Sequence, residues 1–121
     1  LSELAIGIGP FVVGLPIERK IGLSAFSQLT INATGWQTAQ WAKEKGLFAE
    51  VYDSAEEMDA AIQTLAEKLA SSNLKSMQGL KKIMWEGTDH WDKLLRERAE
   101  ISGKRVLSDF TRKTIEKLSN T

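Results

Sequence analysis

Residues 54–69, SAEEMDAAIQTLAEKL, predict the most regular element of the chain. Ser54 and Glu57 have the spacing of a capping box, in which each residue satisfies a free backbone amide at the start of a helix. The apolar residues behind this cap recur at intervals of three and four, so they share one face of a helix. They are Met58, Ala61, Ile62, Leu65, Ala66 and Leu69. A mainly helical protein is therefore expected.

Toward the C-terminus the sequence predicts three more helices. The first begins near Leu74 and stops near Gly87, with the apolar spacing of Leu74, Met77, Leu80 and Met84. A longer helix runs through Trp91 to Ile101, with Thr88 or Asp89 as its cap. A last helix follows Ser108.

Toward the N-terminus we predict shorter elements. Residues 17–31 fit a helix despite Gly22, and Thr34 to Gln37 has the spacing of a second capping box, which predicts a helix over residues 36–45. Gly46 is placed to end that helix in the left-handed conformation. Two short strands are expected, one near the start of the apolar run at residues 4–17 and one over residues 48–52.

The composition limits the classes of function. The chain has 121 residues, 42% hydrophobic and 26% charged, with a formal net charge of zero, so no global field attracts nucleic acid or an anionic membrane. With no cysteine and only one histidine, no metal site is expected. The run at residues 4–17 is interrupted by glycine and proline and is shorter than the roughly 20 residues that cross a bilayer. We expect a cytoplasmic protein, and Leu1 in place of methionine suggests a longer parent chain.

Two stretches carry a resemblance to a known family. Glu3, Gly7, Pro10 and Gly14 fall at the intervals of an active-site segment in the enoyl-CoA hydratase/isomerase (crotonase) superfamily, and the step at residues 19–22 also matches. Residues 29–47 resemble that family's leucine-rich helix, threonine-glycine cap, paired alanines and glycine-leucine exit. The chain looks like the C-terminal half of such an enzyme, with the methylglutaconyl-CoA hydratase branch as one candidate.

The resemblance implies an architecture. The chain would be an α-rich fragment with one or two short strands, from the C-terminal part of a crotonase-like α/β spiral fold that includes its helical trimerisation region. Residues 1–52 would end the α/β core, and residues 53–121 would serve oligomerisation and closure of the acyl-CoA pocket. A homotrimer or hexamer is implied, with some of the four tryptophans between subunits.

The resemblance also implies a chemistry, in which the parent hydrates a 2-enoyl-CoA thioester to a 3-hydroxyacyl-CoA in fatty acid metabolism. Glu3 matches one of two glutamates that share the proton transfers of the water. The other glutamate and the backbone amides of the oxyanion hole are expected upstream. Pro10, Phe11, Phe110 and Lys113 are the candidate substrate-binding residues, and coenzyme A enters as part of the substrate, with no further cofactor.

The sequence is also compatible with other functions. Without the resemblance, Glu3 is an ordinary solvated carboxylate, and Lys113 is part of a solvated helix face. The same superfamily includes enoyl-CoA isomerases, acyl-CoA hydrolases and decarboxylases. The usual glycine-rich turn is replaced by bulky residues 11–13, and the register of Phe110 and Lys113 is loose. A non-enzymatic helical module that serves assembly is the alternative from a different class.

Overall fold

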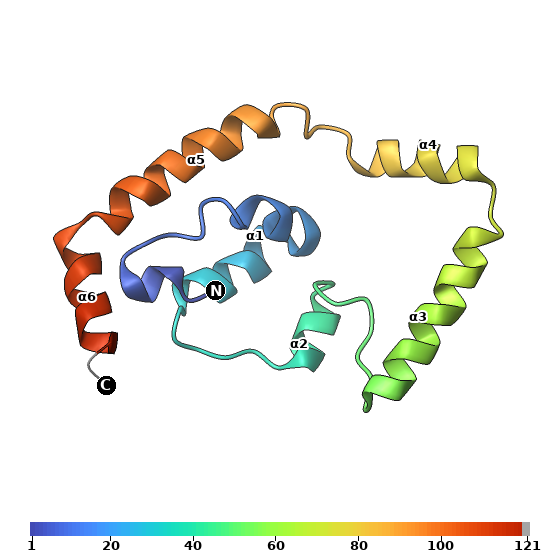
Figure 1. Cartoon of the computed structure of the whole chain (residues 1–121), viewed down its shortest axis with the longest axis horizontal. Helices are drawn as coiled ribbons and strands as arrows, with labels where there is room; N and C mark the ends of the chain where they lie inside the picture. Colours follow the sequence, from blue (N-terminus) through green and yellow to red (C-terminus); the bar gives the residue numbers. More distant parts are fainter. Residues whose placement is uncertain (120–121) are drawn as a thin grey trace. The chain divides into compact units, whose positions relative to one another are not determined.

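The computed structural model describes residues 1–119, and the only regular elements in these residues are helices, which make up 69% of them (Figure 1). Two compact units are present, Leu1–Ala49 with the C-terminal segment from Asp92, and Glu50–Trp91. The expectation of an α-rich chain is confirmed. The elements are η1 (Glu3–Ile6), α1 (Gly14–Ile31), α2 (Ala39–Glu44), α3 (Ala55–Ala70), α4 (Leu74–Met84), α5 (Trp91–Val106) and α6 (Asp109–Ser119).

The two expected strands are wrong, because residues 1–119 contain no strand. The first apolar segment forms the short 3-10 helix η1 and a series of turns. Residues 48–52 are bends and coil, and the amides of Leu47 and Phe48 donate to the carbonyl of Ala42 at the end of α2. A strand needs a neighbouring strand for its backbone hydrogen bonds, and no described segment offers one.

Helix α1 confirms the helix expected over residues 17–31, but it begins earlier and is interrupted. Gly22 has φ 76° and ψ 161°, so the helix consists of two halves that meet at this glycine. Gly14 begins the first half and is buried, and a Cβ atom there would lie 2.8 Å from the Phe26 ring in the second half. This close approach across the break explains why glycine stands at the start of α1.

Helix α2 is shorter than expected and has a different cap. The hydroxyl of Thr38, not Thr34, accepts the hydrogen bond from the Trp41 amide, at 3.0 Å. The predicted capping box at Thr34 and Gln37 is therefore wrong, because a second N-cap residue four positions later takes that role. The prediction for Gly46 is confirmed, since its φ of 79° lies in the left-handed region.

The Glu50–Trp91 unit contains α3 and α4, and both agree with the sequence. Ser54 Oγ accepts from the Glu57 amide at 3.1 Å, and Asn73 Oδ1 accepts from the Ser76 amide at 3.0 Å. Helix α4 ends at Met84, three residues before the expected stop at Gly87. The two helices do not pack on each other. The Trp85 and Trp91 rings meet edge to face, with centroids 6.1 Å apart.

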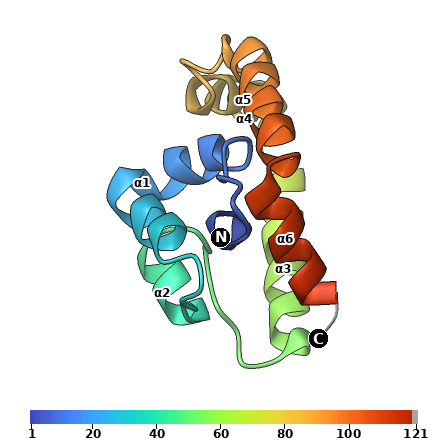
Figure 2. The same cartoon turned by 90° about the vertical axis from the view of Figure 1, so that its left-hand side faces the viewer.

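Helices α5 and α6 complete the other unit together with η1, α1 and α2. Helix α6 follows Ser108, as expected, and Ser108 Oγ caps it by accepting from the Thr111 amide at 3.3 Å. The side chain of Thr88 donates instead to the Trp85 carbonyl. Both views place η1 between α1 and α6, and η1 contacts both helices (Figures 1 and 2).

Few side chains of the described residues are fully buried. Ala25 and Ala42 are the buried hydrophobic residues, at 5% and 6% exposure, and Thr111 is completely buried. The compact units do not follow the expected functional division at residue 52, since α5 and α6 group with the N-terminal segment. That functional division stays a prediction.

Candidate functional site

Glu3 lies in the first turn of η1, at the start of a tight bend in the chain. The Ile8 amide donates to the Glu3 carbonyl at 2.9 Å, and the Gly7 amide donates to the Leu4 carbonyl at 3.1 Å. Gly7 closes the 3-10 helix with φ 81° and ψ 14°, a left-handed conformation that suits glycine. The backbone that carries Glu3 is thus held by local hydrogen bonds.

The Glu3 carboxyl group is in an unusual environment. Its Oε2 atom is shielded from solvent and has no hydrogen-bond partner among the described residues. A buried polar atom without a partner costs free energy on the order of 1–3 kcal/mol. Such groups in native structures often belong to a site completed by a ligand, a water molecule or another chain. Glu3 as a whole is half-buried, so the shielding concerns this one oxygen atom.

A hollow of about 510 Å³ lies beside Glu3. Its wall is formed by the start of the chain and the segment between α1 and α2, namely Leu1, Ser2, Glu3, Ala5, Ala33, Thr34, Gly35 and Trp36. Trp36 is 97% exposed, an extreme value for a tryptophan. An open hollow lined by a carboxylate and an indole has room for an apolar group close to Glu3.

Pro10 and Phe11 line a different hollow, of about 420 Å³. Its lining is mainly apolar, and Arg105 of α5 adds one guanidinium group. Leu4 lines this second hollow, whereas its neighbour Glu3 lines the first. Two consecutive residues of η1 therefore line two different hollows. The structure does not bring Glu3 together with Pro10 and Phe11 in one cavity.

Phe110 and Lys113 lie on α6, close to the bend that follows Glu3. A Cβ atom at Gly7 would lie 2.5 Å from Cδ1 of Phe110, so the Phe110 ring covers this bend. The ring is nevertheless 62% exposed, and Lys113, one turn later, is also exposed. The structure thus places Phe110 near the Glu3 segment, while Lys113 extends from the same helix without a described partner.

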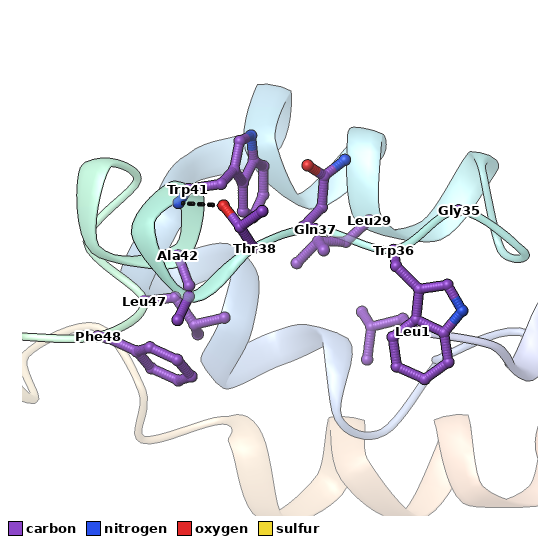
Figure 3. A pocket seen from close by; sticks show the side chains of 11 residues that line it. Leu1, Leu29, Gly35, Trp36, Gln37, Thr38, Trp41, Ala42, Leu47 and Phe48 are labelled. Carbon is purple, nitrogen blue, oxygen red and sulfur yellow. Dashed lines mark hydrogen bonds between the residues drawn. The ribbon is translucent and has the colours of Figure 1, made fainter. Parts of the chain in front are cut away.

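A third hollow, of about 280 Å³, was not expected from the sequence (Figure 3). Leu1 and Trp36 lie at one end of it, and Leu47 and Phe48 lie at the other, next to α2 (Figure 3). The hydrogen bond from the Trp41 amide to Thr38 Oγ1 fixes the helix start along its edge. This hollow could have been inferred from the sequence, where large apolar residues cluster around α2, namely Trp36, Trp41, Leu47 and Phe48.

No group of three or more histidine, aspartate or glutamate side chains comes together in residues 1–119 in a way that could hold a metal ion. Among the helices of the same residues, none combines the length and the apolar character that crossing a membrane requires.

Comparisons with protein-family models, with curated protein sequences and with solved structures give no match to this chain.

Proposed function

We propose that this chain is the C-terminal half of a crotonase-superfamily enzyme, and that the intact enzyme adds water to a 2-enoyl-CoA to give a 3-hydroxyacyl-CoA. The observation that carries the proposal is the Glu3 carboxyl group, whose Oε2 atom is shielded from solvent and unpartnered beside an open hollow. A carboxylate that exchanges a proton with a reacting water must be close to that water and free of competing partners. We place that water in the hollow beside Glu3 in the intact enzyme.

The remaining chemistry is assigned to the upstream half of the proposed parent. Addition of water to the double bond builds negative charge on the thioester oxygen, which backbone amides of an oxyanion hole stabilise. A second glutamate in that half would share the proton transfers with Glu3. If that glutamate is absent from the parent, isomerisation, hydrolysis or decarboxylation of an acyl-CoA replaces hydration in this proposal.

The bend after Glu3 supplies candidate contacts to the substrate. Pro10 and Phe11 line the apolar hollow of about 420 Å³, which suits an acyl chain or the pantetheine arm of coenzyme A. Phe110 covers the same bend from α6. Lys113 is exposed on that helix, where its ammonium group is available to the phosphates of coenzyme A. These assignments need no cofactor beyond the coenzyme A of the substrate.

The exposed apolar side chains support an oligomer, which we propose to be a homotrimer or hexamer. The stripe of α3 remains open, with Ile62 at 56%, Leu65 at 58% and Leu69 at 49% exposure. Leu74, Leu80 and Ile83 of α4 are more than half exposed as well. Exposed apolar faces of this extent usually mark an interface. We further propose a cytoplasmic location, with neither nucleic acid nor membrane as a partner.

The same open faces favour a second candidate function, a helical module that serves only assembly. An assay of the intact parent and of the 121-residue chain, each with crotonyl-CoA, separates the two candidates. We expect turnover by the parent and none by the chain alone, because its oxyanion donors are missing. Turnover by the chain alone would contradict the proposed division of the active site. Failure of both proteins to bind an acyl-CoA would support the assembly module.

A further inference from the structure

The segment from Gly7 to Gly14 joins the turn of Glu3 to α1, and its own hydrogen bonds are few. The Phe11 amide donates to the Gly9 carbonyl and the Gly14 amide to the Pro10 carbonyl, both at 2.8 Å. The segment contains three glycines and has no regular secondary structure between Ile8 and Pro10. These local hydrogen bonds alone therefore do not fix the position of the segment relative to the rest of the unit.

Arg98 of α5 makes a contact with this segment across 87 residues of sequence. Its Nη1 atom donates to the Phe11 carbonyl oxygen at 3.3 Å. Arg98 is half-buried and lies on the inner stripe of α5, one turn after the half-buried Leu94 and Leu95. A guanidinium group has five N–H donors in a fixed planar geometry and no acceptor, so its hydrogen bond to a backbone carbonyl has a defined direction.

The other end of the segment is held by α6. A Cβ atom at Gly7 would lie 2.9 Å from Thr111 Oγ1, and Thr111 is fully buried. Thr111 Oγ1 donates to the Arg105 carbonyl at 3.0 Å and accepts from Ser108 Oγ at 3.0 Å. The start of α6 is thus tied to the end of α5 by a buried hydroxyl, and Gly7 packs directly against it.

We infer that α5 and α6 hold the segment after Glu3 at two points, Gly7 and Phe11, and that Arg98 is the positioning residue at the second point. The carbonyl of Phe11 is fixed by Arg98, and the Phe11 side chain then lines the apolar hollow beside η1. The C-terminal helices therefore set the geometry of the active-site segment, in addition to any role in assembly. The kinetic part of this inference rests on the proposed function.

Three variants of the intact parent test the inference. Arg98→Met removes the donor and keeps a long apolar stem, and Arg98→Lys keeps the positive charge and one possible donor. Arg96→Met is the matched control, because Arg96 is exposed on the same helix. Two measurements are compared, hydrogen exchange of the Phe11 and Gly14 amides and the steady-state kinetics with crotonyl-CoA.

We expect Arg98→Met to accelerate exchange of these two amides roughly three- to tenfold, which corresponds to the loss of one hydrogen bond. The kcat should fall roughly ten- to a hundredfold with KM changed less than about twofold, because misplaced catalytic groups lower the rate of the chemical step. Arg98→Lys should recover part of both losses, and Arg96→Met should behave as the wild type. Partial recovery would separate a positioning role from a general loss of packing.

Wild-type exchange of the Phe11 and Gly14 amides in Arg98→Met would overturn the inference, whatever the kinetics. Equal losses in Arg98→Met and Arg96→Met would also overturn it, since α5 as a whole would then be affected. If the parent turns over no acyl-CoA, the proposed function fails, and the exchange measurement still decides whether Arg98 holds the segment.

Discussion

The unit that contains Glu3 and the Glu50–Trp91 unit are built in different ways. In the first, η1 packs against α1 and α6, and Arg98 reaches Phe11 from a distant part of the sequence. In the second, α3 and α4 are capped by Ser54 and Asn73 but do not pack on each other. Long-range contacts thus define the candidate site, whereas local hydrogen bonds define the two helices with open apolar faces.

The two units therefore differ in what stabilises their helices. Isolated helices of 11 and 16 residues are marginal in water, because most helical stability in proteins comes from packing of an apolar face. We therefore propose that a partner surface covers the faces of α3 and α4, either the upstream half of the proposed enzyme or another subunit. The turn of Glu3 instead packs against α1 and α6 of the same unit. What it lacks among the described residues is a hydrogen-bond partner for Glu3 Oε2.

The largest expected effect concerns Glu3 itself. Glu3→Gln in the intact parent should lower kcat by a factor on the order of 10²–10⁴ with little change in substrate binding, because the amide cannot exchange the proton. Glu67→Gln is the control from the other unit, since Glu67 is exposed on α3. Steady-state kinetics with crotonyl-CoA measure both. Nearly full kcat in the Glu3 variant would refute the catalytic assignment.

Alanine substitutions at two glycines should change stability in opposite directions. Gly7→Ala should lower the free energy of unfolding by about 2–4 kcal/mol, because Gly7 has a left-handed backbone and its Cβ would meet the buried Thr111 Oγ1. Gly79→Ala in α4 should raise it by up to about 1 kcal/mol, since a Cβ there meets nothing within 4 Å. Denaturation of the intact parent tests the pair, and changes of the same sign would contradict the contrast between the units.

A charge on the open face of α3 tests whether that face has a partner. Leu65→Lys should weaken the covering contact by about 1.5–3 kcal/mol, the contribution of burying one leucine side chain. Gln63→Lys adds the same charge on the polar side of α3, where its ammonium group can meet Glu67 one turn later, so little change is expected. Light scattering and thermal melting of the intact parent show whether assembly or folding is affected. If both variants behave as the wild type, nothing covers the face.

The smallest effect concerns helix capping. Ser54→Ala should lower the stability of α3 by about 1 kcal/mol, because the Glu57 amide loses its partner. Thr34→Ala should stay within about 0.5 kcal/mol, because Thr38 and not Thr34 caps α2. Denaturation followed by circular dichroism compares the two. A loss at Thr34 as large as that at Ser54 would restore the predicted capping box at Thr34.

Most helices from residue 54 onward could be predicted from the sequence. Ser54, Asn73 and Ser108 each accept a hydrogen bond from an amide three residues later, so the start of the helix is encoded in a few neighbouring residues. At Thr34 the same reasoning failed, because Thr38 offered a competing cap within the same stretch. The expected strands failed because an apolar run of glycine and β-branched residues does not specify a neighbouring strand.

The candidate site was only partly predictable. Glu3, Pro10, Phe11, Phe110 and Lys113 were singled out through the family resemblance. The structure places the first four around the bend or its hollows, whereas Lys113 is exposed on α6 and lines none of the described hollows. Arg98 was missed, although a charged residue on the apolar stripe of Leu94 and Leu95 was a usable signal. The buried state of Glu3 Oε2 could not be read from the sequence, because burial depends on neighbours that are distant along the chain.

The sequence by itself determined the helical character of the chain, the cap of α3, and the apolar faces of α3 and α4. These features depend on residues within one or two turns of each other, where spacing and geometry are directly related. Only the tertiary structure decided that η1 lies between α1 and α6, that Thr111 is buried against Gly7, and that Arg98 holds Phe11. Those contacts join residues far apart in sequence, and their geometry arises only when the helices pack.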